Sequence, residues 1–311
     1  MSRYAAIDCG TNAIRLLIAD VHDGELMEID RRMLTVRLGE GIDATGEFAP
    51  AALARTFAAV DEYAEQIAAS RATAVRMVAT SASRDARNAD QFIDGVHQRL
   101  GIVPEVVSGT QEAELSFLGA VRGLAASLIS PVLVADIGGG STELILGDAA
   151  SARIDASYSM DIGCVRMTER HLHSDPPTDE EVRATVATIG TAVDQALEQV
   201  PVEEVASFVG LAGSVTTVAA LAHGLPVYDA AAIHGSVTSD SQVAEVTNRL
   251  LMMTRDQRAA EPVMHPGRVD VIAGGALVLR ELMSRLPVNE VIAGETDILD
   301  GIVYRLSSSV G

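Results

Sequence analysis

One short segment occurs twice in this chain, and the repeat limits the fold more than any other feature. Residues 8–20 read D-C-G-T-N-A-I-R-L-L-I-A-D and residues 136–148 read D-I-G-G-G-S-T-E-L-I-L-G-D, so the segments align without a gap. Each copy follows an apolar run and contains Asp-x-Gly, a turn of small residues, a second apolar run and a closing Asp. This pattern is typical of a β-hairpin with a tight turn. The repeat therefore predicts two copies of one structural unit.

The turn of each predicted hairpin has the composition of an anion-binding site. Glycine permits positive φ and the close approach of a ligand, and successive N–H groups in such a turn form an anion-binding nest. Two of these turns facing each other would make a phosphate clamp. The turn residues that we expect to bind phosphate are Thr11, Asn12, Gly138, Gly139, Gly140 and Ser141.

A chain of 311 residues is long enough for two domains of about 150 residues each. We place the N-terminal domain at residues 1–125 and the C-terminal domain at residues 126–311, with the option that the C-terminal helix at about residues 297–311 packs back on the first domain. Strands alternate with helices in both halves, which predicts an α/β fold with a mixed sheet. Besides the hairpins, we expect strands at residues 32–38, 75–79, 105–107, 132–136, 208–211 and 290–293, and helices at residues 50–70, 91–100, 111–121, 178–199, 213–221, 269–285 and 297–305.

The charge of the chain excludes some classes of protein. The formal net charge is −20, which argues against a nucleic-acid partner, because nucleic-acid binding relies on neutralising phosphates. No apolar run approaches the roughly 18 residues needed to cross a bilayer, so we expect no membrane partner. The first residues lack the layout of a signal peptide, which predicts a cytoplasmic location.

The cations of the chain are 23 arginines and no lysine. A Walker-A loop and Schiff-base chemistry both need lysine, so the sequence excludes them. Any phosphate site must therefore use arginine, backbone N–H groups and metal ions.

Three carboxylates lie on or beside the two turns: Asp8, Asp136 and Glu143. A phosphate site rich in carboxylates repels its ligand unless a divalent cation lies between them, and Mg²⁺ prefers one or two carboxylates plus phosphate oxygens. We therefore predict that these residues are metal ligands, with Asp136 as the first choice. The alternative for Asp8 and Asp136 is stabilisation of the turn, since Asp often bonds its own backbone there.

Further candidate residues lie in other segments. Gly213 and Ser214 form a turn that follows a strand and begins a helix, so its N–H groups suit a phosphate. Arg84 follows a strand and suits phosphate binding, although a solvated helix start is an equal alternative. Arg268 precedes a Gly-Gly helix start and is a candidate substrate contact. Glu112 lies on the first turn of a predicted helix, where the helix dipole favours a carboxylate whatever its role.

Six blocks together resemble the exopolyphosphatase and guanosine-pentaphosphate phosphatase (Ppx/GppA) family. The resemblance implies two actin-like (ribonuclease H-like) domains of the sugar kinase, Hsp70 and actin superfold, a cleft between them, and hydrolysis of a terminal phosphoanhydride with Mg²⁺, Mn²⁺ being an alternative. The blocks are D-C-G-T-N-A-I-R-L, A-T-S-A-S-R-D-A-R-N, S-G-T-Q-E-A-E-L-S-F-L-G, D-I-G-G-G-S-T-E-L, M-D-I-G-C-V-R-M-T-E and G-L-A-G-S-V-T-T.

Residue by residue, the resemblance implies roles for the candidates above. Glu112 matches the glutamate that activates water, Asp136 and Glu143 match acidic catalytic and metal-site residues, and Arg84 matches a phosphate-binding arginine. Asn12 and residues 138–141 match the phosphate turns. The sequence departs from the family at Ala13, Gln111 and Asp297, where members often carry Ser, Glu and a basic segment.

The resulting expectation is an exopolyphosphatase that prefers short inorganic polyphosphate, with a homodimer as the candidate assembly and the oligomeric state left open by the sequence. The alternative of the same class is a guanosine pentaphosphate 5′-phosphohydrolase. Alternatives of other classes are an acetate- or sugar-kinase-like phosphotransferase and a nucleotide-gated interaction protein. A kinase would need a pocket for an acceptor near Glu112.

Overall fold

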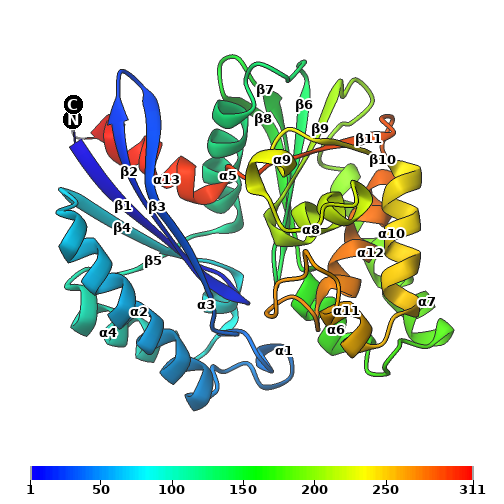
Figure 1. Cartoon of the computed structure of the whole chain (residues 1–311), viewed down its shortest axis with the longest axis horizontal. Helices are drawn as coiled ribbons and strands as arrows, with labels where there is room; N and C mark the ends of the chain where they lie inside the picture. Colours follow the sequence, from blue (N-terminus) through cyan, green and yellow to red (C-terminus); the bar gives the residue numbers. More distant parts are fainter. Residues whose placement is uncertain (1, 310–311) are drawn as a thin grey trace. The chain divides into compact units, whose positions relative to one another are not determined.

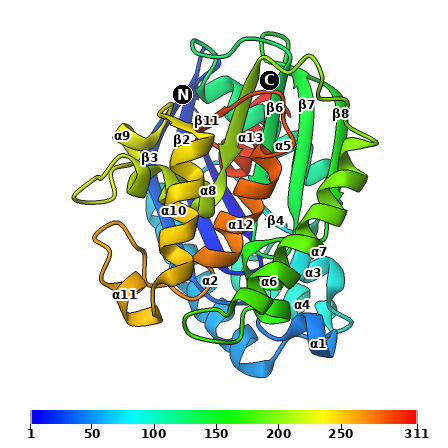
Figure 2. The same cartoon turned by 90° about the vertical axis from the view of Figure 1, so that its right-hand side faces the viewer.

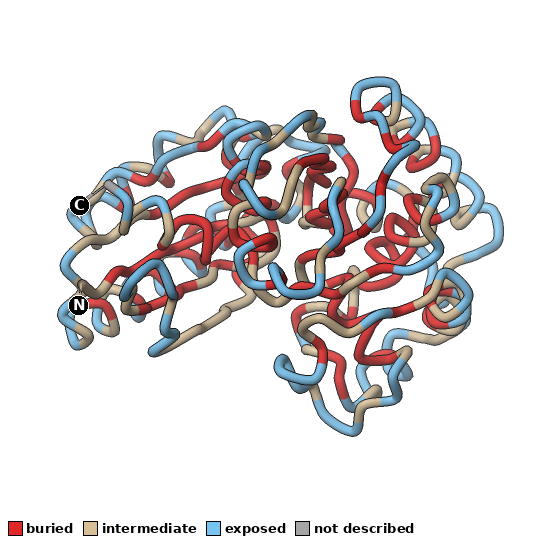
Figure 3. Tube along the Cα trace, turned by 90° about the horizontal axis from the view of Figure 1, so that it is seen from above, coloured by how far each residue is buried: buried red, intermediate tan, exposed pale blue. Residues whose placement is uncertain are grey.

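The structure is a computed structural model, and it describes residues 2–309 (Figure 1). The chain divides into two compact units, one made of Met1–Gly119 with Ile298–Gly311 and the other of Ala120–Asp297. The sequence places this boundary at residues 125/126, six residues later in the chain, and assigns the C-terminal helix to the second domain with the option of packing back on the first. Buried residues concentrate along the strands and the inner faces of the helices (Figure 3).

The first unit is built on a five-stranded sheet in the order β3-β2-β1-β4-β5. β2 lies antiparallel to both β1 and β3, whereas β4 lies parallel to β1 and β5 parallel to β4. The strands are β1 (Ser2–Cys9), β2 (Ala13–His22), β3 (Glu25–Thr35), β4 (Ala74–Ala79) and β5 (Glu105–Val106), and the helices are α1 (Ile42–Thr45), α2 (Pro50–Ser70), α3 (Ser81–Asp85), α4 (Ala89–Leu100), α5 (Gly109–Gly123) and α13 (Ile298–Ser309). The last turn of α5, from Ala120, belongs to the second unit.

Both faces of this sheet are buried. Alternate residues of β1 belong to different cores, because successive side chains of a strand point to opposite faces. Ile7 packs with residues of α2 and α4, whereas Ala6 packs with residues of α5 and α13. The C-terminal helix α13 contacts β1 and β2 and so completes the first unit.

The second unit is built on a six-stranded sheet in the order β10-β11-β9-β6-β7-β8. β7 lies antiparallel to both β6 and β8, while β9 lies parallel to β6 and β11 parallel to β9. Helix α12 contacts α6, α7, α8 and α10 (Figure 2). The strands are β6 (Val132–Ile137), β7 (Thr142–Asp148), β8 (Arg153–Met160), β9 (Ser207–Leu211), β10 (Val237–Ser239) and β11 (Glu290–Ala293), and the helices are α6 (Cys164–His171), α7 (Asp179–Leu197), α8 (Ala212–Ala222), α9 (Ala230–Ile233), α10 (Asp240–Met252), α11 (Arg255–Ala259) and α12 (Ile272–Met283).

The two units repeat one topology. Three antiparallel strands are followed by two strands parallel to the first, and only β10 lacks a counterpart in the first unit. The repeated segments of the sequence occupy equivalent places, β1–β2 in one sheet and β6–β7 in the other. The predicted α/β class and the two hairpins are therefore confirmed.

Three strands differ from the expectations: the short β10 has no predicted counterpart, and the other two are β3 and β8. The predicted strand at residues 32–38 is the end of β3, which begins at Glu25, and β8 has no predicted counterpart. Both are the third strand of a unit, and both are half-exposed with many charged or small residues. Pairing with β2 and β7 stabilises these two strands, and few of their residues are fully buried.

No helix among residues 2–309 combines the length and the apolar character that crossing a membrane requires.

Candidate active site

The turn at residues 138–141 joins β6 to β7, and the N-terminus of α6 holds its carbonyl side. The N–H of Gly138 donates to the carbonyl oxygen of Ser141 (3.1 Å) and so closes the turn. The N–H of Cys164, the first residue of α6, donates to the carbonyl oxygen of Gly138 (3.0 Å). The other hydrogen bonds to the carbonyl oxygens of this turn come from Val165 N–H to Gly139 (2.9 Å), Arg166 N–H to Gly139 (3.1 Å) and Arg166 Nε to Gly140 (2.7 Å).

The opposite side of this turn presents backbone N–H groups. Across residues 2–309, no protein group accepts a hydrogen bond from the N–H of Gly139 or of Gly140. Because the carbonyl oxygens of the turn are engaged by α6, the N–H groups point the other way. Consecutive N–H groups in this arrangement form an anion-binding nest. This geometry supports the predicted phosphate site.

Asp136 and Glu143 lie directly opposite each other on β6 and β7, beside the turn. Both are buried, with 7% and 1% of their surface exposed. Ser159 lies opposite Glu143 on the next strand, β8, and its Oγ donates to Oε1 of Glu143 (2.8 Å). Two buried carboxylates therefore lie side by side within reach of the turn.

These two carboxylates fit the donor set of a magnesium ion. Mg²⁺ is usually held by one or two carboxylates together with substrate phosphates and water. Within the described part of the chain, no cluster of three or more His, Cys, Asp or Glu side chains could hold a metal by itself. The pair formed by Asp136 and Glu143 therefore suits an ion that binds together with a phosphate.

The first hairpin has a different pair of opposed residues at the equivalent position. Asp8 lies opposite Arg15 on β1 and β2, and Nη2 and Nε of Arg15 donate to Oδ2 of Asp8 at 2.7 Å and 3.0 Å. In the alignment of the two repeats, Arg15 takes the place of Glu143. Since the guanidinium neutralises the carboxylate, Asp8 is the weakest of the three predicted metal ligands.

The first turn has the same backbone support as the second. The N–H of Gly39 donates to the carbonyl oxygen of Thr11 (2.9 Å), and the N–H groups of Val36 and Arg37 donate to that of Asn12 (3.1 Å and 2.8 Å). This supporting segment follows the third strand of its unit, as the start of α6 does in the second unit. The repeat therefore extends beyond the hairpin to the segment that holds it.

Arg84 and Glu112 are brought together, although 28 residues separate them in the sequence. Nη1 of Arg84 donates to Oε2 of Glu112 (2.7 Å) and to the carbonyl oxygen of Val107 (3.0 Å). Glu112 is buried, with 8% of its surface exposed. The arginine therefore fixes the orientation of the carboxylate predicted to activate water.

The helix that carries Glu112 begins with a reciprocal pair of hydrogen bonds. The N–H of Ser108 donates to Oε1 of Gln111 (2.9 Å), and the N–H of Gln111 donates to Oγ of Ser108 (3.2 Å). This is the arrangement of a capping box. Gln111, which departs from the family pattern, thus caps α5 and leaves Glu112 as the buried carboxylate of this turn.

In the second unit, the guanidinium of Arg268 lies against Gly213. A Cβ at Gly213 would clash with the guanidinium of Arg268, so a side chain at this position would displace the arginine. Nη1 of Arg268 donates to Oγ1 of Thr217 (3.0 Å), and its Cζ lies 5.9 Å from the centroid of the Tyr228 ring. The structure therefore brings two predicted site residues, Arg268 and Gly213, together at the start of α8.

Local contacts hold the residues around Gly213 and Arg268 in place. Burial and the nearby Arg268 guanidinium lower the pKa of His265, whose Nδ1 accepts a hydrogen bond from the N–H of Gly267 (3.1 Å). Ser214 is buried, and a Cβ at Gly275 would lie 2.1 Å from its Oγ. The hydroxyl of Ser214 therefore faces α12.

The predicted site residues form two sets, one in each unit. Four contacts or pairings unite members of a set: Arg84 with Glu112, Asp136 with Glu143, the turn at residues 138–141, and Arg268 with Gly213. The members in the first unit are Asp8, Thr11, Asn12, Arg84 and Glu112, and those in the second are Asp136, Gly138, Gly139, Gly140, Ser141, Glu143, Gly213, Ser214 and Arg268.

Comparison with known proteins agrees with this geometry. The model of the Ppx/GppA phosphatase family matches residues 17–310. The chain belongs to the Ppx/GppA phosphatase family. The resemblance of the six sequence blocks is thereby confirmed.

Other proteins are similar to this chain over nearly its full length and theirs. Exopolyphosphatase 2 of Mycobacterium tuberculosis is 51% identical over 320 residues, which cover 99% of each chain. A solved structure of an exopolyphosphatase-like protein superposes with a TM-score of 0.95 at 39% identity, covering 99% of this chain and 100% of that one. A family member from Aquifex aeolicus superposes with a TM-score of 0.84 at 28% identity, covering 100% and 99%. These structures confirm the predicted fold class.

Sequence reasoning missed three residues that contact the candidate site. Gly163 packs against the backbone of Gly139, Arg166 donates hydrogen bonds to Gly139 and Gly140, and Ser159 donates one to Glu143. Gly163 and Arg166 occur in the block M-D-I-G-C-V-R-M-T-E, which carried the family resemblance but had no assigned role. Their function depends on contacts with a turn more than 20 residues away in the sequence.

The tight packing at Gly163 leads to a testable prediction. A Cβ at this position would lie 2.5 Å from the carbonyl carbon and oxygen of Gly139, which are backbone atoms of the turn. We expect Gly163→Ala to lower the free energy of unfolding by about 1–3 kcal/mol, as overpacking does, and to raise KM for a phosphate substrate. Thermal unfolding and steady-state kinetics measure the two effects.

Gly10→Ala is the control, because a Cβ at Gly10 would keep an ordinary distance of 3.5 Å from the carbonyl oxygen of Ala13. Its stability should stay close to that of the wild type. Equal stability losses in the two variants would show that contact with the turn is not the reason for glycine at residue 163.

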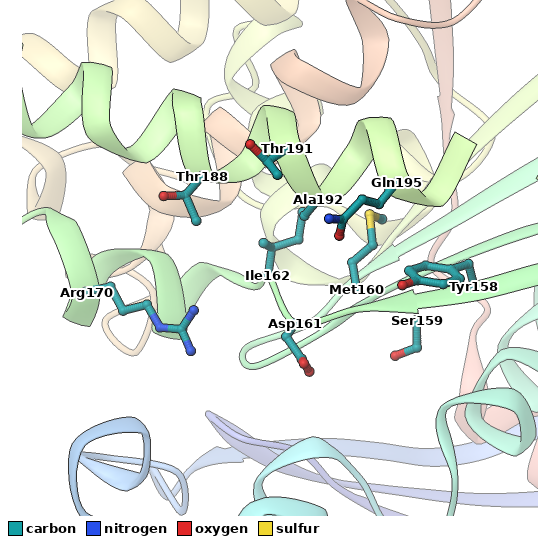
Figure 4. Close-up of a pocket in the computed structure, with 10 residues that line it drawn as sticks. All are labelled: Tyr158, Ser159, Met160, Asp161, Ile162, Arg170, Thr188, Thr191, Ala192 and Gln195. Carbon is teal, nitrogen blue, oxygen red and sulfur yellow. The ribbon is translucent and has the colours of Figure 1, made fainter. Parts of the chain in front are cut away.

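The second unit of this Ppx/GppA chain also contains a cavity of about 430 Å³, whose lining includes none of the predicted site residues but does include Ser159, the hydrogen-bond partner of Glu143. Figure 4 shows that its lining side chains come from β8, the loop after it, α6 and α7. The cavity is absent from the sequence-based expectations because its residues are dispersed in the sequence. They are Tyr158, Ser159, Met160, Asp161, Ile162, Arg170, Thr188, Thr191, Ala192 and Gln195.

Proposed function

We propose that this protein is an exopolyphosphatase, which hydrolyses the terminal phosphoanhydride of inorganic polyphosphate in a Mg²⁺-dependent reaction. The observation that carries the proposal is the turn at residues 138–141, where the unengaged N–H groups of Gly139 and Gly140 lie beside the buried Asp136 and Glu143. An anion nest next to two carboxylates suits a phosphate that binds together with a cation. The name of the M. tuberculosis relative, Exopolyphosphatase 2, supports the same activity.

The residues of the second unit have binding roles in this proposal. The turn at residues 138–141 holds a phosphoryl group through its N–H groups, and Arg268 beside Gly213 supplies a fixed positive charge. Asp136 and Glu143 would hold Mg²⁺, which neutralises charge on the phosphate oxygens when it is bound. Because the chain has no lysine, arginine and N–H groups supply the remaining stabilisation.

Glu112 has the proton-transfer role. Its carboxylate accepts a proton from the attacking water as the oxygen of that water bonds to the terminal phosphorus. The bridging P–O bond breaks in line, which releases orthophosphate and a chain shorter by one unit. Arg84 keeps the carboxylate oriented through the 2.7 Å hydrogen bond from Nη1.

The proposal predicts the substrate and its preferred length. We expect phosphate release from tripolyphosphate to have a higher kcat/KM than release from chains of hundreds of units, compared per chain end. The net charge of −20 repels the distal phosphates of a long chain, and salt screens this repulsion within a Debye length of about 8 Å. The difference in kcat/KM between short and long chains should therefore narrow as KCl is raised at fixed free Mg²⁺.

Guanosine pentaphosphate and ATP are measured in the same assay, with and without acetate or a sugar as acceptor. A higher kcat/KM for guanosine pentaphosphate, or phosphate transfer to an acceptor, would favour the alternative functions. Preference for long chains at low salt, lost at high salt, would reveal a local basic track and contradict the expected length dependence. A cytoplasmic location and a homodimer stay predictions.

A further inference from the structure

Three polar residues form a row across three neighbouring strands of the second unit. Asp136 on β6 lies opposite Glu143 on β7, and Glu143 lies opposite Ser159 on β8. Directly opposed residues share one face of a sheet. Ser159 therefore lies next to Glu143 on the side away from Asp136.

The hydroxyl of Ser159 fixes the carboxylate of Glu143. Its Oγ donates to Oε1 at 2.8 Å, and only 1% of the surface of Glu143 is exposed. The terminal torsion of a glutamate side chain is broad, so packing alone defines the plane of the carboxylate poorly. A donor on one oxygen sets this plane and thus the direction of the other oxygen.

We propose that Ser159 is a positioning residue that orients Glu143 for binding the divalent cation. The inference rests on the proposed function, in which Asp136 and Glu143 hold that cation. Groups that hydrogen-bond a metal-ligating side chain fix its orientation, and their loss typically lowers metal affinity or activity about 10–100-fold. Ser159 has this relation to Glu143.

The place of Ser159 in the strand is itself well defined. The next residue, Met160, is buried in the main core of the second unit and lies opposite Thr142. Figure 4 shows Met160 beside Ala192 and Gln195 of α7. Anchoring of Met160 therefore keeps β8 in the register that sets Ser159 against Glu143.

The chain offers a matched control on the same strand. Ser157 lies two residues earlier, so its side chain points to the same face of the sheet, but its opposite residue is Ile145. Ser157→Ala removes a hydroxyl from β8 without touching a carboxylate. Ser159→Thr retains the hydroxyl and suits a strand, so it is the conservative variant.

The experiment measures Mn²⁺ binding to the metal-free protein by electron paramagnetic resonance, at a fixed concentration of inorganic phosphate. We expect Ser159→Ala to weaken Mn²⁺ binding about 10-fold or more, and Ser159→Thr and Ser157→Ala to bind as the wild type does. Thermal unfolding shows whether each variant is folded. Asp136→Asn serves as the variant that removes a proposed ligand.

The outcomes separate this inference from the proposed function. Wild-type Mn²⁺ affinity in Ser159→Ala, with binding lost in Asp136→Asn, would overturn the role of Ser159 and leave the metal site intact. Equal weakening in Ser159→Ala and Ser159→Thr would also overturn it, because the hydroxyl would not be the cause. If the wild type itself binds no Mn²⁺, both the metal site and the inference are wrong.

Discussion

Glu112→Gln should lower kcat by about 10²–10⁴-fold, the usual contribution of a general base, with KM little changed. The amide retains the shape of the side chain, and its oxygen still accepts the hydrogen bond that Nη1 of Arg84 donates at 2.7 Å. The variant should therefore fold normally. It loses only the ability to take a proton from water. Steady-state phosphate release from tripolyphosphate measures kcat and KM separately.

Glu114→Gln is the matched control for this variant. Glu114 lies on the same helix, but its side chain is half-exposed and its closest arginine nitrogen, Nη2 of Arg305, lies 3.9 Å away. We expect its kcat to stay within about twofold of the wild type, because exposed ion pairs contribute little. Retention of most turnover in Glu112→Gln, or equal losses in both variants, would remove the proposed base.

Asp136→Asn should lower activity at moderate Mg²⁺ by about 100-fold or more, because the proposed metal ligand loses its negative charge. Loss of a residue that only hydrogen-bonds a metal ligand already lowers metal affinity or activity about 10–100-fold. Wild-type activity should vanish with EDTA and return with Mg²⁺ or Mn²⁺. The variant should need far higher Mg²⁺ for half-maximal activity. A titration of Mg²⁺ at constant ionic strength measures this concentration.

Asp148→Asn is the control for the metal prediction. Asp148 closes the same repeated segment, but its carboxylate accepts hydrogen bonds from the N–H (2.9 Å) and Oγ (2.6 Å) of Ser151 in the following turn. Its Mg²⁺ requirement should match that of the wild type. If the two variants respond to Mg²⁺ alike, Asp136 is not a ligand.

The repeat in the sequence was sufficient to predict the hairpins and the central strands. Asp-x-Gly and the apolar runs are local signals, and β1–β2 and β6–β7 occur where the repeat indicates. The edge strands β3 and β8 were harder because pairing with a neighbour, and not a hydrophobic pattern, stabilises them.

The site was predictable only in part, because its geometry depends on register. The alignment of the repeats already sets Arg15 against Glu143, yet only the strand pairing shows that one faces Asp8 and the other Asp136. Likewise, no local sequence pattern around Glu112 predicts its hydrogen bond to Arg84. Gly163 and Ser159 act through contacts that the fold creates between distant segments.

The ion pair in the first hairpin makes the two repeated hairpins different in charge, which bears on the proposed binding of polyphosphate. The two hairpins share one backbone arrangement but differ in charge. The charges of Asp8 and Arg15 cancel each other, whereas Asp136 and Glu143 are both acidic. A linear polyphosphate is identical when read from either end, so it carries no polarity of its own. In the proposed function, the cation binds at the second hairpin, where Asp136 and Glu143 lie opposite each other. Under this proposal, the end of a symmetric polyphosphate that binds beside the cation differs in its surroundings from the rest of the chain.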